Sequence, residues 1–169
     1  MRNNATSLTN RRPRGGPIII RGIERRAIFR DNKDRDSFID RLGGVLLESA
    51  TPCYAWSLLS NHGHFLFKTG EVSGMSWALT GHAVTFNRRH DRHGHLFQNR
   101  YKSILCEEDA YLKELVRYLH LNPLRAGLVK NLEVFATCPY SGHSVMMGQK
   151  KGSGRTKIWK TSNPATKSP

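Results

Sequence analysis

The sequence His-Gly-His occurs twice, at residues 62–64 and 93–95, and each copy raises the question of a metal site. Alternate side chains of a strand point to opposite faces of a sheet. In the first copy, which reads NHGHFLF with its neighbours, this alternation places both imidazoles on one face and two phenylalanines on the other. A pair of imidazoles on a rigid element suits a divalent cation. His62 and His64 are therefore candidate metal ligands.

The second copy lacks this alternation. It lies in the polar stretch NRRHDRHGH, where a basic loop that contacts phosphate or water is expected. An isolated His-x-His is more often a solvated or hydrogen-bonded pair than a metal site. The strand context is what favours the first copy over the second.

A third ligand and a reactive group are found in EEDAYLKELVRYLHLNP, a segment with helical periodicity. Its apolar stripe consists of Leu112, Leu115, Val116 and Leu119. Tyr118 lies about 110° from the centre of that stripe. Asn122 follows one turn later on the same edge, about 6 Å along the axis. This spacing would bring a tyrosine to a metal-bound phosphate and an amide oxygen to the metal. Ordinary packing of the tyrosine and a helix-ending asparagine remain open alternatives.

Composition points to a polyanionic partner. The 169 residues include 27 Lys and Arg against 13 Asp and Glu, a formal charge of +14. Nucleic acid is favoured over an anionic membrane because no long basic amphipathic helix is present. No apolar run approaches the roughly 20 residues that cross a bilayer, and no secretory signal is visible. A cytoplasmic protein with no membrane partner is expected.

The three cysteines have no CxxC spacing, which argues against a disulfide framework and a thiolate zinc site.

The chain divides into a basic flexible arm (1–16), one domain (17–146) and a basic tail expected to be disordered (147–169). Within the domain, the expected strands are residues 17–22, 53–59, 62–68 and 99–105. Three helices separate or follow these strands: one capped by Asp31 or Asp34, one capped by Ser73, and a last one ended by Pro123. The order βαββαβα predicts a single ferredoxin-like α+β domain in which helices pack on an antiparallel sheet.

Four stretches carry a resemblance to a known family. They are IIIRGIERRAIFRD, YAWSLLSNHGHFLF, FNRRHDRHGHLFQNRYKSIL and EEDAYLKELVRYLHLNPLRAGLV. Together these stretches resemble the single-tyrosine transposases of the HUH nuclease superfamily, in particular the REP-associated tyrosine transposase branch, over about residues 17–146. His62 and His64 match the metal-binding His-x-His of that family. Tyr118 matches its tyrosine nucleophile, and Asn122 matches its polar third ligand.

The resemblance implies a ferredoxin-like or RRM-like fold and a metal-dependent DNA endonuclease and strand transferase. The implied substrate is single-stranded DNA, cut beside a palindromic REP-like hairpin through a 5′-phosphotyrosine intermediate. Mg²⁺ or Mn²⁺ is the implied cofactor, and the protein acts as a monomer or homodimer. The main alternative is a nucleic-acid-binding module without chemistry, or an inactive transposase relic. The tail after Gly148 departs from the family pattern, which keeps the relic open. A structural zinc module would need a fourth ligand that the sequence does not offer.

Basic residues near the proposed site are expected to hold DNA through its phosphates. They are Arg21, Arg25, Arg88, Arg89, Arg92, Arg100 and Lys102. A solvated charged surface is the alternative for each of them.

Overall fold

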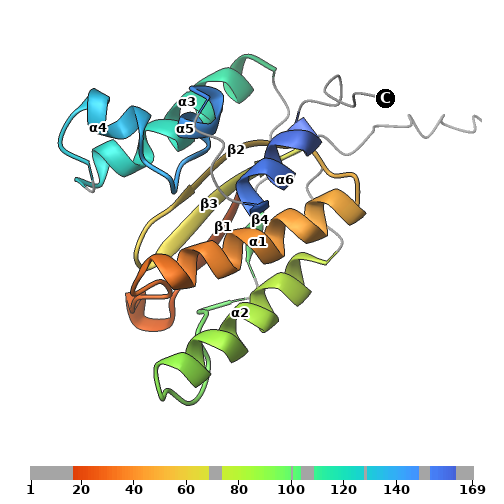
Figure 1. Cartoon of the computed structure of the whole chain (residues 1–169), viewed down its shortest axis with the longest axis vertical. Helices are drawn as coiled ribbons and strands as arrows, with labels where there is room; N and C mark the ends of the chain where they lie inside the picture. The colour runs from red at the N-terminus through yellow and green to blue at the C-terminus, as the bar shows by residue number, and fades with distance from the viewer. Residues whose placement is uncertain are drawn as a thin grey trace, which may run out of the picture.

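Four strands form one antiparallel sheet in the computed structural model, which describes residues 17–68, 74–99, 101–103, 109–127, 129–148 and 153–162. The strands are β1 (Pro17–Arg21), β2 (Cys53–Leu58), β3 (His62–Phe67) and β4 (Lys102–Ser103). Their order across the sheet is β2-β3-β1-β4. With helices packed on this sheet, the ferredoxin-like α+β prediction is confirmed (Figure 1).

The helices, in chain order, are η1 (Ile23–Arg25), α1 (Asn32–Glu48), α2 (Met75–Arg89), α3 (Asp109–Arg125), α4 (Leu132–Ala136), α5 (Gly142–Met146) and α6 (Ser153–Ser162). Figure 1 shows α1 and α2 lying side by side. None of the helices among the described residues is both long and apolar enough to cross a lipid bilayer.

The main core lies between the sheet and the helices α1 and α2. Ile18, Phe65 and Phe67 face it from the sheet and are fully buried. Phe38 of α1 and Phe86 of α2 meet them from the helices. The β3 pattern puts its phenylalanines on this side, so its histidines point to the opposite face, as the alternation predicts.

The boundaries of two predicted helices differ from expectation. Pro123 lies inside α3, which continues to Arg125, so the prediction that this proline ends the helix is wrong. The helix ends instead before Gly127, whose φ of +69° is the left-handed conformation that glycine adopts easily. Gly74 caps α2, whereas the predicted cap Ser73 lies outside the described residues.

The tail contains a helix where disorder was expected. Helix α6 packs along α1, and Ile158 is only 2% exposed because it enters the main core. The two helices approach closely where Gly43 and Gly154 meet: a Cβ on Gly43 would lie 2.7 Å from the Gly154 carbonyl oxygen. The Gly154 amide also donates to the Asp40 carboxylate. A close contact between two glycines, a buried isoleucine and this hydrogen bond join the helices, and composition alone did not reveal this pairing.

Two adjacent glycines of α1 test this contact. We expect Gly43→Ala to destabilise the protein by about 1–2 kcal/mol, because overpacking outweighs the gain in helix propensity. A Cβ on Gly44, by contrast, would meet no neighbouring atom within 4 Å. Gly44→Ala should therefore stabilise by about 0.5–1 kcal/mol. Urea unfolding of both variants checks this pair, and equal stabilisation by both changes would contradict the docking of α6.

Candidate active site on the open face of the sheet

His62 and His64 lie together on the sheet face that points away from α1 and α2, here called the open face. Their ring centroids are 4.9 Å apart and the rings are nearly perpendicular, at 81°. In the register of the sheet, Arg21 of β1 is opposite His62, and Ser57 of β2 is opposite His64. Opposed residues of antiparallel strands share a face. The open face therefore carries two imidazoles, a hydroxyl and a guanidinium close together.

Burial keeps both imidazoles neutral near pH 7. Burial, with smaller contributions from the neighbouring His62 and Arg21, lowers the pKa of His64 to about 4. Burial, followed by the charge of Arg21, also lowers the pKa of His62. Neutral imidazole is the form that coordinates metals, since protonation removes the lone pair.

Two imidazoles with a buried hydroxyl on the same face fit a divalent cation. Ser57 is fully buried, and its Oγ has no hydrogen-bond partner among the described residues. Asn122 is 8% exposed; its Nδ2, which has no partner among the described residues, is a donor, so only its Oδ1 could coordinate a metal. Buried polar atoms without partners are uncommon in folded proteins and ask for an explanation such as an ion or water. Two neutral imidazole nitrogens, with the Ser57 hydroxyl opposite one of them, suit Mn²⁺, and Mg²⁺ less strongly.

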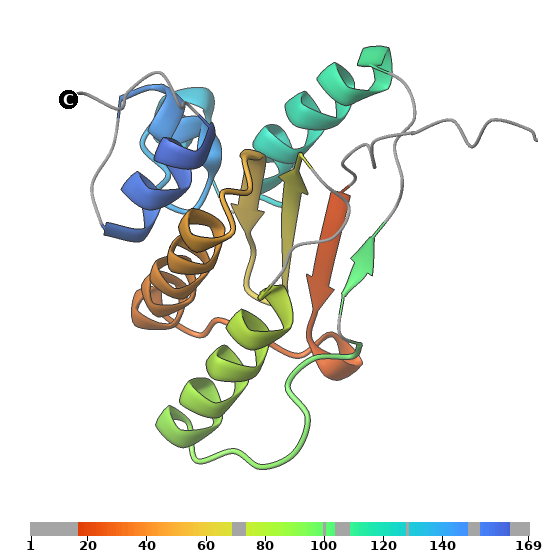
Figure 2. The ribbon, with the colours of Figure 1, turned by 90° about the vertical axis from the view of Figure 1, so that its right-hand side faces the viewer.

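Helix α3 packs on the same face of the sheet. Leu119 contacts Ala55 and Leu66 in a small apolar cluster. Those two residues are two positions along their strands from Ser57 and His64, and so share their face. Figure 2 shows α3 beside the ends of β2 and β3. The helix with the predicted nucleophile thus covers one end of the open face.

The two predicted residues of α3 point differently. Tyr118 is 44% exposed, and the Arg125 guanidinium lies 5.1 Å from its ring centroid. Asn122 is buried. Within the described part of the chain, no ring contact joins Tyr118 to His62 or His64. The fold brings the two histidines together and places α3 on their face, while the tyrosine ring faces solvent.

Two of the predicted DNA-binding cations lie on the open face. Arg21 is opposite His62, and Lys102 of β4 is opposite Ile19, which in turn is opposite His64. Both cations are exposed, as are Arg25 and Arg88 outside the sheet. Arg100 lies outside the described residues.

Arg89, in contrast, forms salt bridges with carboxylates of the same chain. It donates to Asp31, at 2.8 Å, and to Asp34, and His90 also bonds Asp34, at 2.9 Å. The Arg89 hydrogen bond is the main cause that holds the pKa of Asp31 far below its usual range. The ligand atoms of Asp31, Asp34 and His90 lie within 4.8 Å of one another. Because Arg89 already neutralises these carboxylates, the cluster joins the end of α2 to the start of α1.

The adjacent cations Arg88 and Arg89 give a matched test of this role. We expect Arg89→Ala to lower the midpoint of thermal unfolding by several degrees, because it removes the guanidinium partner of the buried Asp34 carboxylate and leaves that carboxylate only its bonds to His90 and the Arg30 amide. Arg88→Ala should leave the midpoint unchanged. A thermal melt that moves equally for both variants would contradict the structural role of Arg89.

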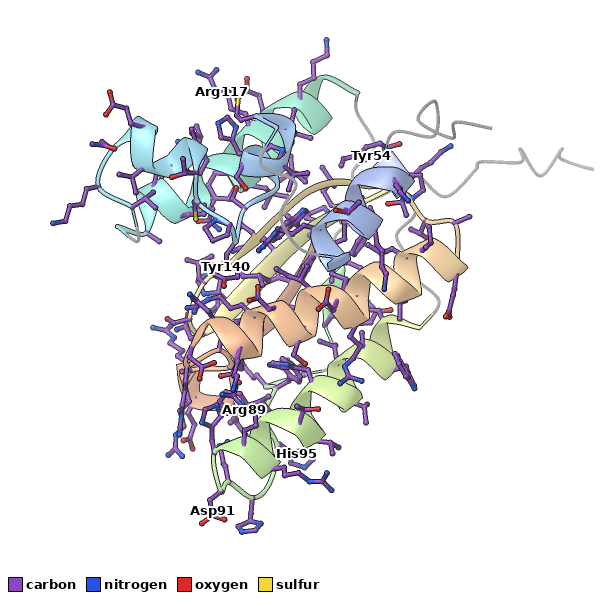
Figure 3. All side chains as sticks on the ribbon, viewed as in Figure 1. Tyr54, Arg89, Asp91, His95, Arg117 and Tyr140 are labelled. Carbon is purple, nitrogen blue, oxygen red and sulfur yellow. The ribbon has the colours of Figure 1, made fainter. Side chains whose placement is uncertain are left out.

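The second His-Gly-His lies in the loop after α2, as expected. His93 and His95 are exposed, and Gly94 adopts a φ of +84°. The Arg92 guanidinium stabilises this loop by donating a hydrogen bond to the His95 carbonyl oxygen, with a nitrogen–oxygen distance of 2.8 Å. Figure 3 labels His95 and Arg89 near the end of α2, at the opposite end of the molecule from Arg117 of α3. These two imidazoles have no rigid strand to hold them.

Sequence reasoning did not single out Ser57. Its cross-strand position opposite His64 follows from the register of the β2–β3 hairpin. That register includes an irregularity between Cys53 and Ala55, which shifts the pairing and is not visible in the alternation of apolar residues.

Comparison with known proteins adds one finding about the fold. No protein-family model matches the sequence, and no curated protein matches it either. A solved structure described as a REP-associated tyrosine transposase bound to a REP hairpin superposes with a TM-score of 0.60. The chain has the fold of that transposase. The match covers 83% of each chain at 14% sequence identity. At this identity the likeness establishes the fold, and any activity must be argued from the site.

Proposed function

We propose that this protein is a metal-dependent nuclease and strand transferase for single-stranded DNA. Tyr118 would be the nucleophile, and His62, His64 and Asn122 would hold Mg²⁺ or Mn²⁺. The observation that carries the proposal is the pair of neutral imidazoles on the sheet face that α3 also covers. Their ring centroids are 4.9 Å apart. The transposase with the similar fold is described as bound to a REP hairpin. A palindromic hairpin is accordingly the substrate that we propose here.

The proposed reaction is a transesterification at phosphorus. The Tyr118 oxygen forms a bond to phosphorus while the bond from phosphorus to the 3′-oxygen breaks. The phenolic proton passes to solvent, and the leaving 3′-oxygen takes up a proton. A bound cation would polarise the phosphate and neutralise developing charge, because tyrosine, with a usual pKa near 10, is a weak nucleophile at neutral pH. The phosphotyrosine ester retains the energy of the phosphodiester, so a 3′-hydroxyl can reverse the step and join a new strand.

Tyr118 must turn toward the site for this reaction. Its described ring contact is an exposed cation–π interaction with Arg125. Such contacts contribute only about 0.5–1 kcal/mol at exposed sites. A DNA phosphate that binds Arg125 would release the ring at little cost. The tyrosine can serve the histidines of its own chain or those of a second copy.

The open face offers a route for the DNA backbone. Arg21 and Lys102 flank the histidines, and Arg25, Arg88 and Arg100 are proposed to extend the phosphate contacts. These residues neutralise phosphate charge, so hairpin affinity should fall steeply with added salt. Arg89 and Arg92 are engaged within the protein and contribute less to this surface.

The decisive experiment looks for a covalent adduct. Purified protein is incubated with Mg²⁺ or Mn²⁺ and a labelled single-stranded oligonucleotide that carries hairpins from the flanks of its own gene. A complex that survives denaturation, and that is absent when EDTA is added, is the expected result. Wild-type protein that binds the hairpins but forms no adduct with either metal would reject the nuclease.

A binding module without chemistry is the second candidate. The observation that favours it is the exposed position of Tyr118, whose ring contacts Arg125 rather than an imidazole. This candidate predicts hairpin binding that is insensitive to EDTA and no adduct. The same experiment therefore separates the two functions.

A further inference from the structure

The side chain of Asn61 connects His62, the first of the two proposed metal ligands, to the turn that contains Arg25. Its Oδ1 lies 2.6 Å from Nδ1 of His62. Its Nδ2 donates to the carbonyl oxygen of Arg25, 3.1 Å away. The side-chain amide is thus held at both ends, with its nitrogen directed to one acceptor and its oxygen directed to the imidazole.

This arrangement decides where the proton of His62 lies. A carbonyl oxygen cannot donate, so the amide nitrogen must face Arg25 and the amide oxygen must face the ring. The amide oxygen can only accept, which makes Nδ1 of His62 the donor. In the neutral ring, Nε2 is then unprotonated and keeps its lone pair for a cation. Second-shell partners of metal-ligand histidines act in this way, by fixing the tautomer and the ring orientation.

The turn that holds Asn61 is itself rigidly built. Glu24 and Arg25 both adopt left-handed backbone conformations, with φ of 51° and 57°. A Cβ on Gly22 would collide with the carbonyl oxygen of Arg26, so only glycine fits there. The Gly22 amide in turn donates to the backbone carbonyl of Asn61, at 2.9 Å. Non-glycine residues persist in this conformation only where their surroundings enforce it, often at functional sites.

A second pair of backbone bonds fixes the residue before Asn61. The amides of Ile28 and Phe29 both donate to the carbonyl oxygen of Ser60, at 2.8 and 2.9 Å. The hairpin turn between β2 and β3 is therefore clamped to the segment 22–29 from both sides. The carbonyl of Arg25 is held in place for the amide of Asn61 as a result.

From these contacts we infer that Asn61 is a positioning residue for the metal site, which fixes His62 in its Nδ1–H tautomer and leaves Nε2 available to the cation. The inference rests on the proposed function for the identity of the ligand. To the proposed ligands it adds Asn61 and the backbone segment 22–29, which act on the metal site through His62. Arg25 links the two roles, because its carbonyl holds Asn61 while its side chain is a proposed phosphate contact.

The tautomer can be measured without any metal or DNA. Long-range ¹H–¹⁵N correlation spectra of ¹⁵N-labelled, EDTA-treated protein distinguish Nδ1–H from Nε2–H, and the His62→Gln variant identifies the His62 signals. We expect the Nδ1–H form in the wild type. An Nε2–H form in the wild type would overturn the inference directly, whether or not the variants below fold.

Two substitutions then test whether Asn61 is what fixes the tautomer of His62. Asn61→Ala should lose the fixed tautomer and weaken Mn²⁺ binding by about 10–100-fold, measured from the free Mn²⁺ signal in electron paramagnetic resonance. Asn61→Asp keeps an acceptor for Nδ1–H and should retain the tautomer, with affinity restored at least in part. The matched control is Asn87→Ala, since Asn87 makes the same kind of amide bond, to the Gly94 carbonyl at 2.9 Å, in the exposed loop.

The outcomes separate the inference from the proposed function. Unchanged tautomer and unchanged Mn²⁺ affinity in Asn61→Ala would overturn the positioning role while leaving the nuclease in place. Equal losses in Asn61→Ala and Asn87→Ala would overturn it as well. If wild-type protein does not bind Mn²⁺ or Mg²⁺ at all, the metal site of the proposed function fails, whatever tautomer His62 has.

Discussion

Tyr118→Phe is expected to abolish the covalent adduct with hairpin DNA and to leave hairpin affinity almost unchanged. The substitution removes only the oxygen that would attack phosphorus. The ring remains, and it can still pack beneath Arg125. A denaturing gel measures the adduct, and a gel-shift titration of the same hairpin measures affinity.

Tyr54→Phe is the matched control for this variant. Tyr54 lies on β2 and is also exposed, at 39%, but it has no part in the proposed chemistry. We expect this variant to form adduct at the wild-type rate. Adduct that persists in Tyr118→Phe would reject the nucleophile assignment, and loss in both variants would point to a general effect of removing a hydroxyl.

The second large effect is expected at the first His-Gly-His. His64→Ala should reduce metal-dependent cleavage by about 100-fold or more, because it would remove one of the two nitrogen ligands of the proposed metal site. His64 is 8% exposed, so its truncation also leaves a cavity in the fold. A thermal melt and the hairpin affinity of the variant show whether the protein remains folded when activity is lost.

His95→Ala gives the comparison for the second copy. His95 is exposed in the loop after α2, so its removal should weaken hairpin binding modestly, to an extent that depends on salt, and leave the cleavage step intact. Single-turnover cleavage at saturating protein separates the two effects. Equal loss of cleavage in both variants, with binding unchanged, would contradict the choice of the first copy.

The local elements were largely predictable because each depends on a short-range pattern. The alternation in β3 placed two histidines opposite two phenylalanines, and the structure has them on opposite faces. Asp31 was one of two predicted caps, and it does accept a hydrogen bond from the Asp34 amide at the start of α1. Of the predicted strand 99–105, Lys102 and Ser103 pair with β1, while residues 100, 104 and 105 lie outside the described residues.

The predictions that depended on partners distant in sequence were less successful. Arg88 and Arg89 are equivalent neighbours in a basic run, yet only Arg89 meets Asp31 and Asp34, from 58 and 55 positions away. The few apolar residues of the tail favour disorder, whereas among the described residues Ile158, the Gly43–Gly154 contact and the Gly154–Asp40 hydrogen bond hold α6 on α1. Which charges meet, and which small residues face each other, depends on how whole helices pack.

Local patterns in the sequence were sufficient to predict the antiparallel α+β fold, the basic character of the surface and the placement of His62 and His64 on one face of a strand. These follow from periodicity and composition, which act through neighbouring residues. The folded chain was needed to reveal that Ser57 lies opposite His64, that α3 covers the same face, and that Asn61 is held between His62 and Arg25. The physical reason is that hydrogen bonds and close contacts need positions fixed to within fractions of an ångström, and that precision arises only when the separate elements have packed together.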